Sequence, residues 1–129
     1  MIRRSGLALL LALATFGSVP AHATGDISCS GEGVSVDMLV GRLPVLSILR
    51  ATVTVGEESW STDQSIMKGT PIAVGQAFED DRIMLVDFMD DNLELVLGRL
   101  RVVNLEDVSA GAFAFEGKGS WIVDCSLRG

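Results

Sequence analysis

Hydrophobic and polar residues alternate with a period of two along much of this chain. In residues 34–40 and 49–55 the apolar side chains, except Leu39, fall on one parity, and Ser, Asp, Thr and Arg fall on the other. This spacing is typical of β-strands that bury one face, because successive side chains of a strand point to opposite sides. Residues 43–49 are apolar on both parities, and this pattern is also compatible with a short helical turn.

Two later segments depart from simple alternation. Residues 82–88 are apolar on both parities, which predicts a central strand covered on both sides. In residues 93–102 the apolar parity changes at Gly98 and Arg99, so the leucines before and after that point fall on different faces. We expect a β-bulge there, since one extra residue returns both sets to the core and glycine is favoured at bulges.

Turn-forming residues separate the alternating segments at short intervals. Gly, Asp and Asn recur between them, as hairpin turns require. The pattern therefore predicts an all-β fold, a small antiparallel barrel or closed sandwich of about seven or eight strands. Cys29 lies on the first predicted strand and Cys125 on the last, each in phase with apolar neighbours. We expect one disulfide to link these terminal strands, which would close the sheet.

Residues 1–23 have the parts of an export signal. Arg3 and Arg4 give a positive start, and an apolar stretch at 7–16 follows that is too short to span a bilayer. Ala21-His22-Ala23 is a small-x-small cleavage pattern. We therefore expect residues 1–23 to be a cleaved signal peptide and residues 24–129 to form one β domain, secreted into the bacterial periplasm.

Cleavage at that position would change the chemistry of the chain. It would remove Arg3, Arg4 and His22, which is the chain's one histidine, and leave 8 basic against 17 acidic residues, a net charge of −9. Without histidine a Ser-His-Asp triad, a Cys-His pair or a His-based zinc site cannot form, so we expect no catalysis and no cofactor. The acidity disfavours nucleic acid as a partner and favours a basic protein, and we expect no membrane insertion after cleavage.

Two groups of residues are candidates for a site. Trp60 sits among polar neighbours, so it is either an exposed anchor for a partner, with Gln76 contributing nearby, or a cap on one end of the barrel. Asp90, Asp91 and Asn92 offer oxygen ligands for calcium, although Asp and Asn are equally the residues that hairpin turns prefer. Their spacing does not match an EF-hand loop.

The function expected from these features is that of an exported, non-catalytic binding or interaction domain of the periplasm or envelope. The general plan, an exported β-barrel with one disulfide, resembles small bacterial lysozyme-inhibitor domains. That resemblance is one of architecture, and it carries no residue across. It adds the hypothesis of a small inhibitor that meets a basic hydrolase by charge complementarity. The alternatives are a calcium-dependent envelope module and a carboxylate-based hydrolase.

Overall fold

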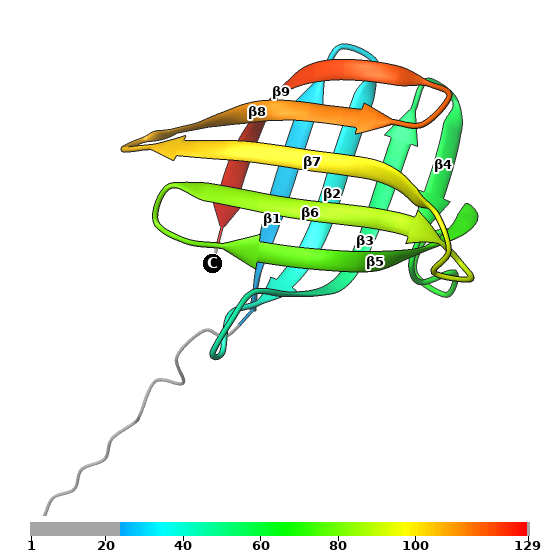
Figure 1. Cartoon of the computed structure of the whole chain (residues 1–129), viewed down its shortest axis with the longest axis horizontal. Coiled ribbons are helices and arrows are strands. Elements are labelled where there is room, and N and C mark those ends of the chain that lie inside the picture. The colour runs from blue at the N-terminus through cyan, green and yellow to red at the C-terminus, as the bar shows by residue number, and fades with distance from the viewer. Residues whose placement is uncertain (1–23, 129) are drawn as a thin grey trace, which may run out of the picture.

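In the computed structural model, nine β-strands close into a barrel (Figure 1). The structure describes residues 24–128, so the predicted signal peptide at 1–23 lies outside the described residues. The strands are β1 (Thr24–Gly31), β2 (Val34–Gly41), β3 (Ser47–Val55), β4 (Glu58–Ser61), β5 (Thr70–Glu79), β6 (Ile83–Asp90), β7 (Val96–Leu105), β8 (Val108–Phe115) and β9 (Gly119–Arg128). The predicted all-β fold is confirmed, and closed-barrel topology settles the choice between barrel and sandwich.

The strand count and one pairing differ from the prediction. Nine strands form rather than seven or eight, and the four-residue β4 is the shortest of them. Strands that follow one another in the chain pair antiparallel, except that β4 and β5 pair in parallel. The reason is the loop at 62–69, which carries the chain back along β4 before β5 starts. The described part of the chain contains no helix long and apolar enough to cross a membrane.

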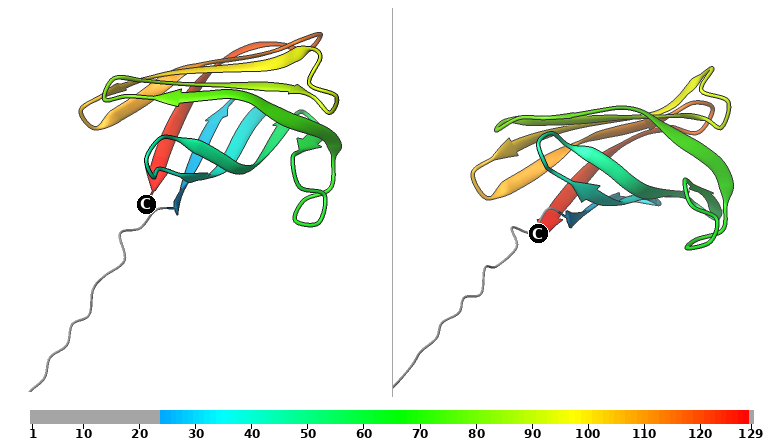
Figure 2. Two further views of the ribbon diagram at one scale, coloured as in Figure 1. Left: turned by 60° about the horizontal axis from the view of Figure 1, so that its bottom comes forward. Right: turned by 90° about the horizontal axis from the view of Figure 1, so that it is seen from below.

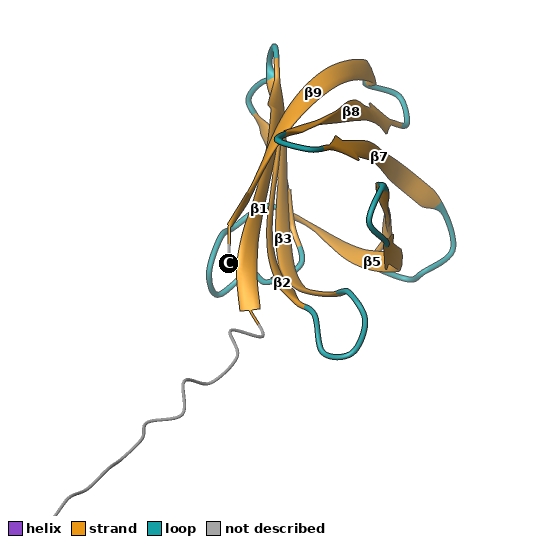
Figure 3. Ribbon diagram, turned by 90° about the vertical axis from the view of Figure 1, so that its left-hand side faces the viewer, coloured by secondary structure: helices purple, strands orange, loops and turns teal. Residues whose placement is uncertain are grey.

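The barrel is flattened into two layers. Strands β5–β8 cross in front of β1–β4 in Figure 1, and Figure 2 shows the same two layers from other directions. β9 joins them, because it pairs with β8 along its first half and with β1 along its second (Figure 3). Each strand therefore has an inner face that packs in the core and an outer face that no other described element covers, except where a loop folds over it.

The core is filled by the apolar parity of the strands. Fully buried side chains include Val36, Val53, Phe88, Phe113 and Val123, contributed by five different strands. Aromatic rings gather in one part of the interior, where the Phe113 ring lies edge-on to Phe88, tilted to Phe115 and stacked with Trp121. Burying a side chain of this size stabilises the fold by roughly 1.5–3 kcal/mol. The predicted inward set at 34–40 is thus confirmed, and on the last strand the apolar residues in phase with Cys125, Trp121 and Val123, also pack in the core.

The prediction that residues 82–88 are covered on both sides is wrong. On β6 only Met84, Val86 and Phe88 are fully buried, and they alternate with residues that are exposed or half-buried. Ile83 is exposed on the outer face. The wall of a barrel is one sheet thick, so apolar residues on the outer parity stay accessible unless another element covers them.

Bulges displace several leucines that the alternation places in the core. The register passes from Phe88 opposite Gly98 to Met89 opposite Val96, so the bulge lies at Leu97, one residue before the predicted position. Leu95 is exposed in the β6–β7 turn rather than buried. A second bulge skips Leu49 and leaves it exposed. Residues 43–46 form no helix, because the chain there is an irregular loop that leads into β3.

We expect Gly98→Val to lower the free energy of unfolding by about 2 kcal/mol, the middle of the range for overpacked cores. Gly98 faces inward, and a Cβ there would lie 3.2 Å from two atoms of the Phe113 ring. The φ angle of Gly98 is not positive, so crowding rather than backbone strain is the reason. Urea unfolding followed by circular dichroism measures the effect. A variant as stable as the parent would show that the Phe113 ring can move aside.

The predicted disulfide is present where the barrel closes. Cys29 and Cys125 are opposite each other in the β1–β9 pairing, with their Cα atoms 4.0 Å apart, and their sulfur atoms are bonded. The terminal strands are therefore joined both by backbone pairing and by a covalent link. A disulfide is consistent with an extracellular or periplasmic location.

Candidate functional site

A hollow of about 230 Å³ lies on the outer face of β1–β4. The loop at 62–69 forms one wall of it, and Figure 2 shows this loop, in green, projecting from the side of the β1–β4 layer that faces away from β5–β8. The hollow is therefore on the outside of the barrel, not in its packed interior. It combines strand residues with loop residues, which is the common composition of binding sites on rigid β scaffolds.

Two rows of side chains across three strands form the floor. The register places Asp26, Leu39 and Arg50 in one row. The next row holds Asp37 between Ser28 and Thr52. These are the polar parity of β1, β2 and β3, so the same alternation that fills the core also points these groups outward. The Ser28 hydroxyl donates to the Asp37 carboxylate at 2.6 Å, which fixes the orientation of that carboxylate.

The loop wall begins at Ser61, the last residue of β4. Its side chain is on the outer parity, yet only 1% of the residue is exposed because the loop folds back over it. The Asp63 N–H donates to Ser61 Oγ at 3.1 Å, and the Thr62 hydroxyl accepts from the Ala51 N–H at 2.8 Å. These bonds fasten the start of the loop to β3 and β4.

Asp63 then shapes the rest of the wall. Its carbonyl accepts the N–H groups of Ile66 and Met67, and its carboxylate accepts both the N–H and the hydroxyl of Ser65. The turn presents Ile66 and Met67, both exposed, to the hollow. With Leu39 on the floor, they give the hollow an apolar side beside its charged groups.

The charge of the hollow is negative. Three carboxylates, those of Asp26, Asp37 and Asp63, line it together with one guanidinium, that of Arg50. The hydrogen bonds from the Ser65 side chain and backbone hold the pKa of the Asp63 carboxyl below its usual value, and the positive charge of Arg50 adds to this. Asp63 is therefore ionised at neutral pH. Its carboxylate accepts the Ser65 bonds while keeping a full negative charge at the rim.

This arrangement suits a cation that also has an apolar part. Carboxylates form their strongest hydrogen bonds with charged donors such as ammonium and guanidinium groups. The Leu39, Ile66 and Met67 side chains offer contact to an alkyl chain, and long basic side chains bury such a stem while their charged end stays hydrated. Lysine and arginine side chains have both features.

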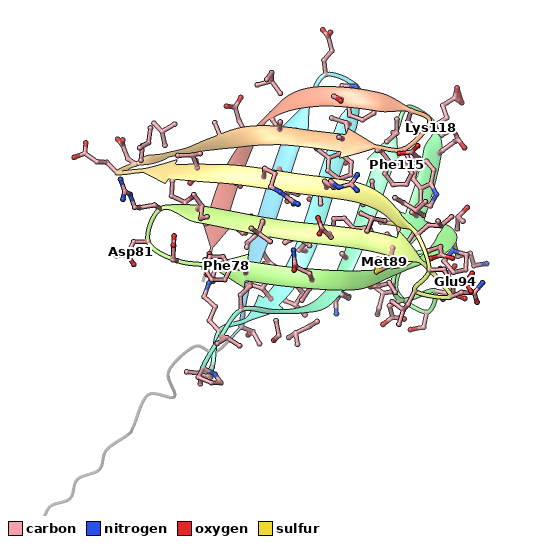
Figure 4. The ribbon with its side chains drawn as sticks, in the orientation of Figure 1. Phe78, Asp81, Met89, Glu94, Phe115 and Lys118 are labelled. Atoms are coloured by element: carbon pink, nitrogen blue, oxygen red, sulfur yellow. A yellow bond between two sulfur atoms is a disulfide. The ribbon has the colours of Figure 1, made fainter. Side chains whose placement is uncertain are left out.

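Trp60 is not part of this hollow. It lies on β4 opposite Val53 and points inward, with 7% of the residue exposed. Its ring centroid is 4.5 Å from that of Phe115, and Lys118 Nζ lies 5.8 Å from the Trp60 ring. Figure 4 shows Phe115 and Lys118 at this end of the barrel. Trp60 therefore caps one end of the core and is not an exposed anchor.

Gln76 is on a different face, the outer side of β5. Its Nε2 donates to Asp87 Oδ2 at 3.2 Å, and Arg101 makes an ion pair with the other carboxylate oxygen of Asp87 at 2.9 Å. Gln76 and Trp60 are thus not brought together. The Gln76 side chain orients Asp87 within the outer face of the sheet.

Asp90, Asp91 and Asn92 form the turn between β6 and β7. Asp90 Oδ1 accepts the N–H groups of Glu94 and Leu95 at 2.7 and 2.8 Å. The Leu95 bond, together with that from Glu94, holds the pKa of the Asp90 carboxyl below its usual value. Across residues 24–128 no three or more His, Cys, Asp or Glu side chains are grouped so that they could hold a metal ion. The contacts of Asp90 are those of a residue that stabilises a hairpin turn.

Sequence reasoning missed the residues of the hollow, including Asp26, Asp37, Arg50 and Asp63. The available signal was weak, because Asp37 and Arg50 stand where any solvent-facing strand carries polar groups. Ile66-Met67, an apolar pair within a polar loop, is the one feature that could have pointed to the site. No protein-family model, no curated protein and no solved structure matches this chain.

Proposed function

We propose that this protein is an exported, non-catalytic binding domain that recognises a basic protein partner. The hollow on β1–β4 receives a lysine or arginine side chain of that partner. The observation that carries the proposal is the combination of Asp26, Asp37 and Asp63 with the apolar wall formed by Ile66 and Met67 in one concave site. A basic hydrolase is the partner class we favour, with this domain acting as its inhibitor.

The charge of the whole chain supports this proposal. Seventeen acidic residues against ten basic ones give a formal net charge of −7, so the field of the molecule attracts a basic partner before contact. Charge complementarity of this kind raises the association rate and suppresses wrong partners. The hollow then binds one basic side chain on the partner's surface.

The rigid position of the loop wall supports a recognition role as well. The Ala51 N–H donates to the Thr62 hydroxyl and the Asp63 N–H donates to Ser61 Oγ, which holds the loop to β3 and β4. A site that is formed beforehand loses less conformational entropy on binding than one that must be ordered. Ser28, Thr52 and Ser61 carry the hydroxyls of the hollow, and with no histidine in the described chain none of them has an imidazole base, which favours binding over hydrolysis.

We expect Asp37→Asn to weaken binding to a basic partner by about tenfold, equivalent to about 1.4 kcal/mol. Asparagine keeps the shape and the acceptor for Ser28 but removes the negative charge. The measurement is isothermal titration of the exported protein with lysozyme, a basic hydrolase, and with a lysine-rich peptide. Binding should weaken further as salt is added, because exposed charges are screened within about 10 Å at 0.1 M ionic strength.

Asp107→Asn is the matched control. It removes the same charge from the exposed β7–β8 turn, so it lowers the overall attraction equally without touching the hollow. Equal weakening by Asp37→Asn and Asp107→Asn would show that net charge alone drives binding. No binding to either probe, or binding that neither Asp37→Asn nor Asp26→Asn changes, would contradict the proposal.

A further inference from the structure

The outer face of β5–β9 has an unusual composition for a solvent-facing sheet. Its outward residues form rows across the strands, and the central row runs from Phe78 through Leu85 and Arg101 to Ala112 and Ile122. Ile122 is 76% exposed, Phe78 46%. Figure 4 looks onto this face and labels Phe78 at its lower edge. We call it the β5–β9 face.

The apolar surface continues in the neighbouring row. Ile83 and Val103 are opposite each other, with Val103 47% exposed, and Ala110 follows on β8. By contrast, the outward residues of β1–β3 are mostly Asp, Ser, Thr and Arg. Large exposed apolar patches on a protein are a feature of interaction sites. The outward surface is therefore mainly polar over β1–β3 and more apolar over β5–β9.

The charges on the β5–β9 face balance. It carries Arg99 and Arg101 against Asp87 and Asp124, whereas the whole chain has a formal net charge of −7. A basic partner would be drawn to the acidic surfaces instead. Two copies of an acidic chain repel each other at most orientations, and a neutral apolar face is where that repulsion is least. Most strands of the closed barrel are paired along both edges, which favours association through faces.

We propose that a second copy of this chain docks on the β5–β9 face and forms a twofold-symmetric dimer. In such an isologous contact, each residue pair occurs twice. Strands are ~4.8 Å apart, and outward residues are ~6.7 Å apart along a strand. A twofold axis that lies between the two sheets, passes over Ala112 and is perpendicular to the line from Arg99 to Asp124 places Arg99 of one copy opposite Asp124 of the other. Neither Arg99 nor Asp124 takes part in an ion pair within the described residues.

The same axis lets the two sheets approach closely. Ile122 then projects over Ala112 and Ala114 of the other copy, where the small side chains of β8 leave room. The small outward residues along β8 lower the surface between the longer side chains of β7 and β9, so Ile122 fits into the depression. Apolar contact at the centre with an ion pair on each side is the arrangement typical of protein interfaces.

The size of the face sets the expected affinity. At these spacings the rows cover roughly 450 Å² in projection, and the accessible area of a surface with side chains is larger than its projection. Standard interfaces bury about 800 Å² on each partner, so this face is at the small end. We expect a dissociation constant on the order of 10 μM. The hollows on β1–β4 remain free in this dimer, so the dimer presents two of them.

Sedimentation equilibrium of the protein purified after export, from 1 to 200 μM, tests the dimer. We expect Ile122→Glu to raise the dissociation constant at least about tenfold, because it places a charge in the apolar centre. Leu95→Glu is the matched control: it makes the same exchange at an exposed residue of the β6–β7 turn, outside the face, and should leave the dimer unchanged. The melting temperature of each variant shows that the fold is retained.

A charge exchange tests the position of the axis. Arg99→Asp and Asp124→Arg should each weaken the dimer, and the two together should restore it. A wild-type protein that stays monomeric up to 200 μM, or a dimer that Ile122→Glu does not weaken, would overturn the proposal. Single charge reversals that leave the dissociation constant unchanged would contradict the Arg99–Asp124 pairing. The dimer and the hollow are measured separately, so failure of one leaves the other standing.

Discussion

Replacing both cysteines, Cys29→Ser with Cys125→Ser, should lower the free energy of unfolding by about 4–5 kcal/mol, the chain-entropy value for a loop of this length. The bond joins residues 96 positions apart, so it restricts the unfolded chain over nearly the whole domain. The loss is large against the 5–15 kcal/mol total stability of typical domains. Urea unfolding followed by circular dichroism, with the midpoint and slope fitted together, measures it.

The parent protein treated with a reductant is the control, because it removes the same bond without changing the sequence. It should unfold at the urea midpoint of the double variant within error. The alternative is that backbone pairing of β1 with β9 suffices to hold the barrel closed. Equal stability of the double variant and the oxidised parent would establish that alternative and show that the disulfide has no structural effect.

The strands and the closure of the barrel could be predicted because apolar and polar residues alternate along strands that bury only one face. Each strand packs one face inward, so Val36 and Val53 appear in the sequence two residues from their inward neighbours. The disulfide could be predicted for the same reason. Cys29 and Cys125 are in phase with buried residues, and a bond between them requires the first and last strands to be adjacent.

Whether apolar residues on the outer face are exposed or covered could not be predicted in the same way. Apolar residues such as Ile83 and Leu85 suggested a strand covered on both sides, because local sequence does not reveal whether another element lies above it. The structure leaves Ile83 exposed. Bulges are also hard to place, since a single inserted residue shifts the parity of everything after it, as at Leu49 and Leu97.

The candidate site depends on register, which the sequence does not contain. Asp26 and Arg50 are 24 positions apart, and only the pairing of both with Leu39 puts them in one row. For Trp60 the sequence left two alternatives open, and the structure bears out the cap on one end of the barrel. Its neighbours Ser59 and Ser61 suggested a polar surface, but pairing with Val53 turns the ring inward, and the loop that buries Ser61 covers the other side.

Gly111→Ala should lower the free energy of unfolding by about 3 kcal/mol, the upper end for overpacked sites. Gly111 lies within β8 opposite Val102 on β7. A Cβ at Gly111 would fall far inside van der Waals contact with the backbone carbonyl oxygen of Arg101. A carbonyl in a β-ladder cannot rotate away without losing its hydrogen bond, so β7 and β8 would have to separate locally. Thermal and urea unfolding measure the loss.

Gly75→Ala is the matched control, because it makes the same exchange within a strand of the same barrel. A Cβ at Gly75 would meet the Sδ and Cγ atoms of Met89, and that flexible side chain can change rotamer. We therefore expect Gly75→Ala to change the free energy of unfolding by less than about 1 kcal/mol. The contrast isolates the cause: a close contact is tolerated where a flexible side chain yields and is destabilising where the partner is the backbone of a paired strand. A loss for Gly111→Ala as small as that for Gly75→Ala would mean that β7 and β8 can separate without loss, and that Gly111 is not required for their close approach.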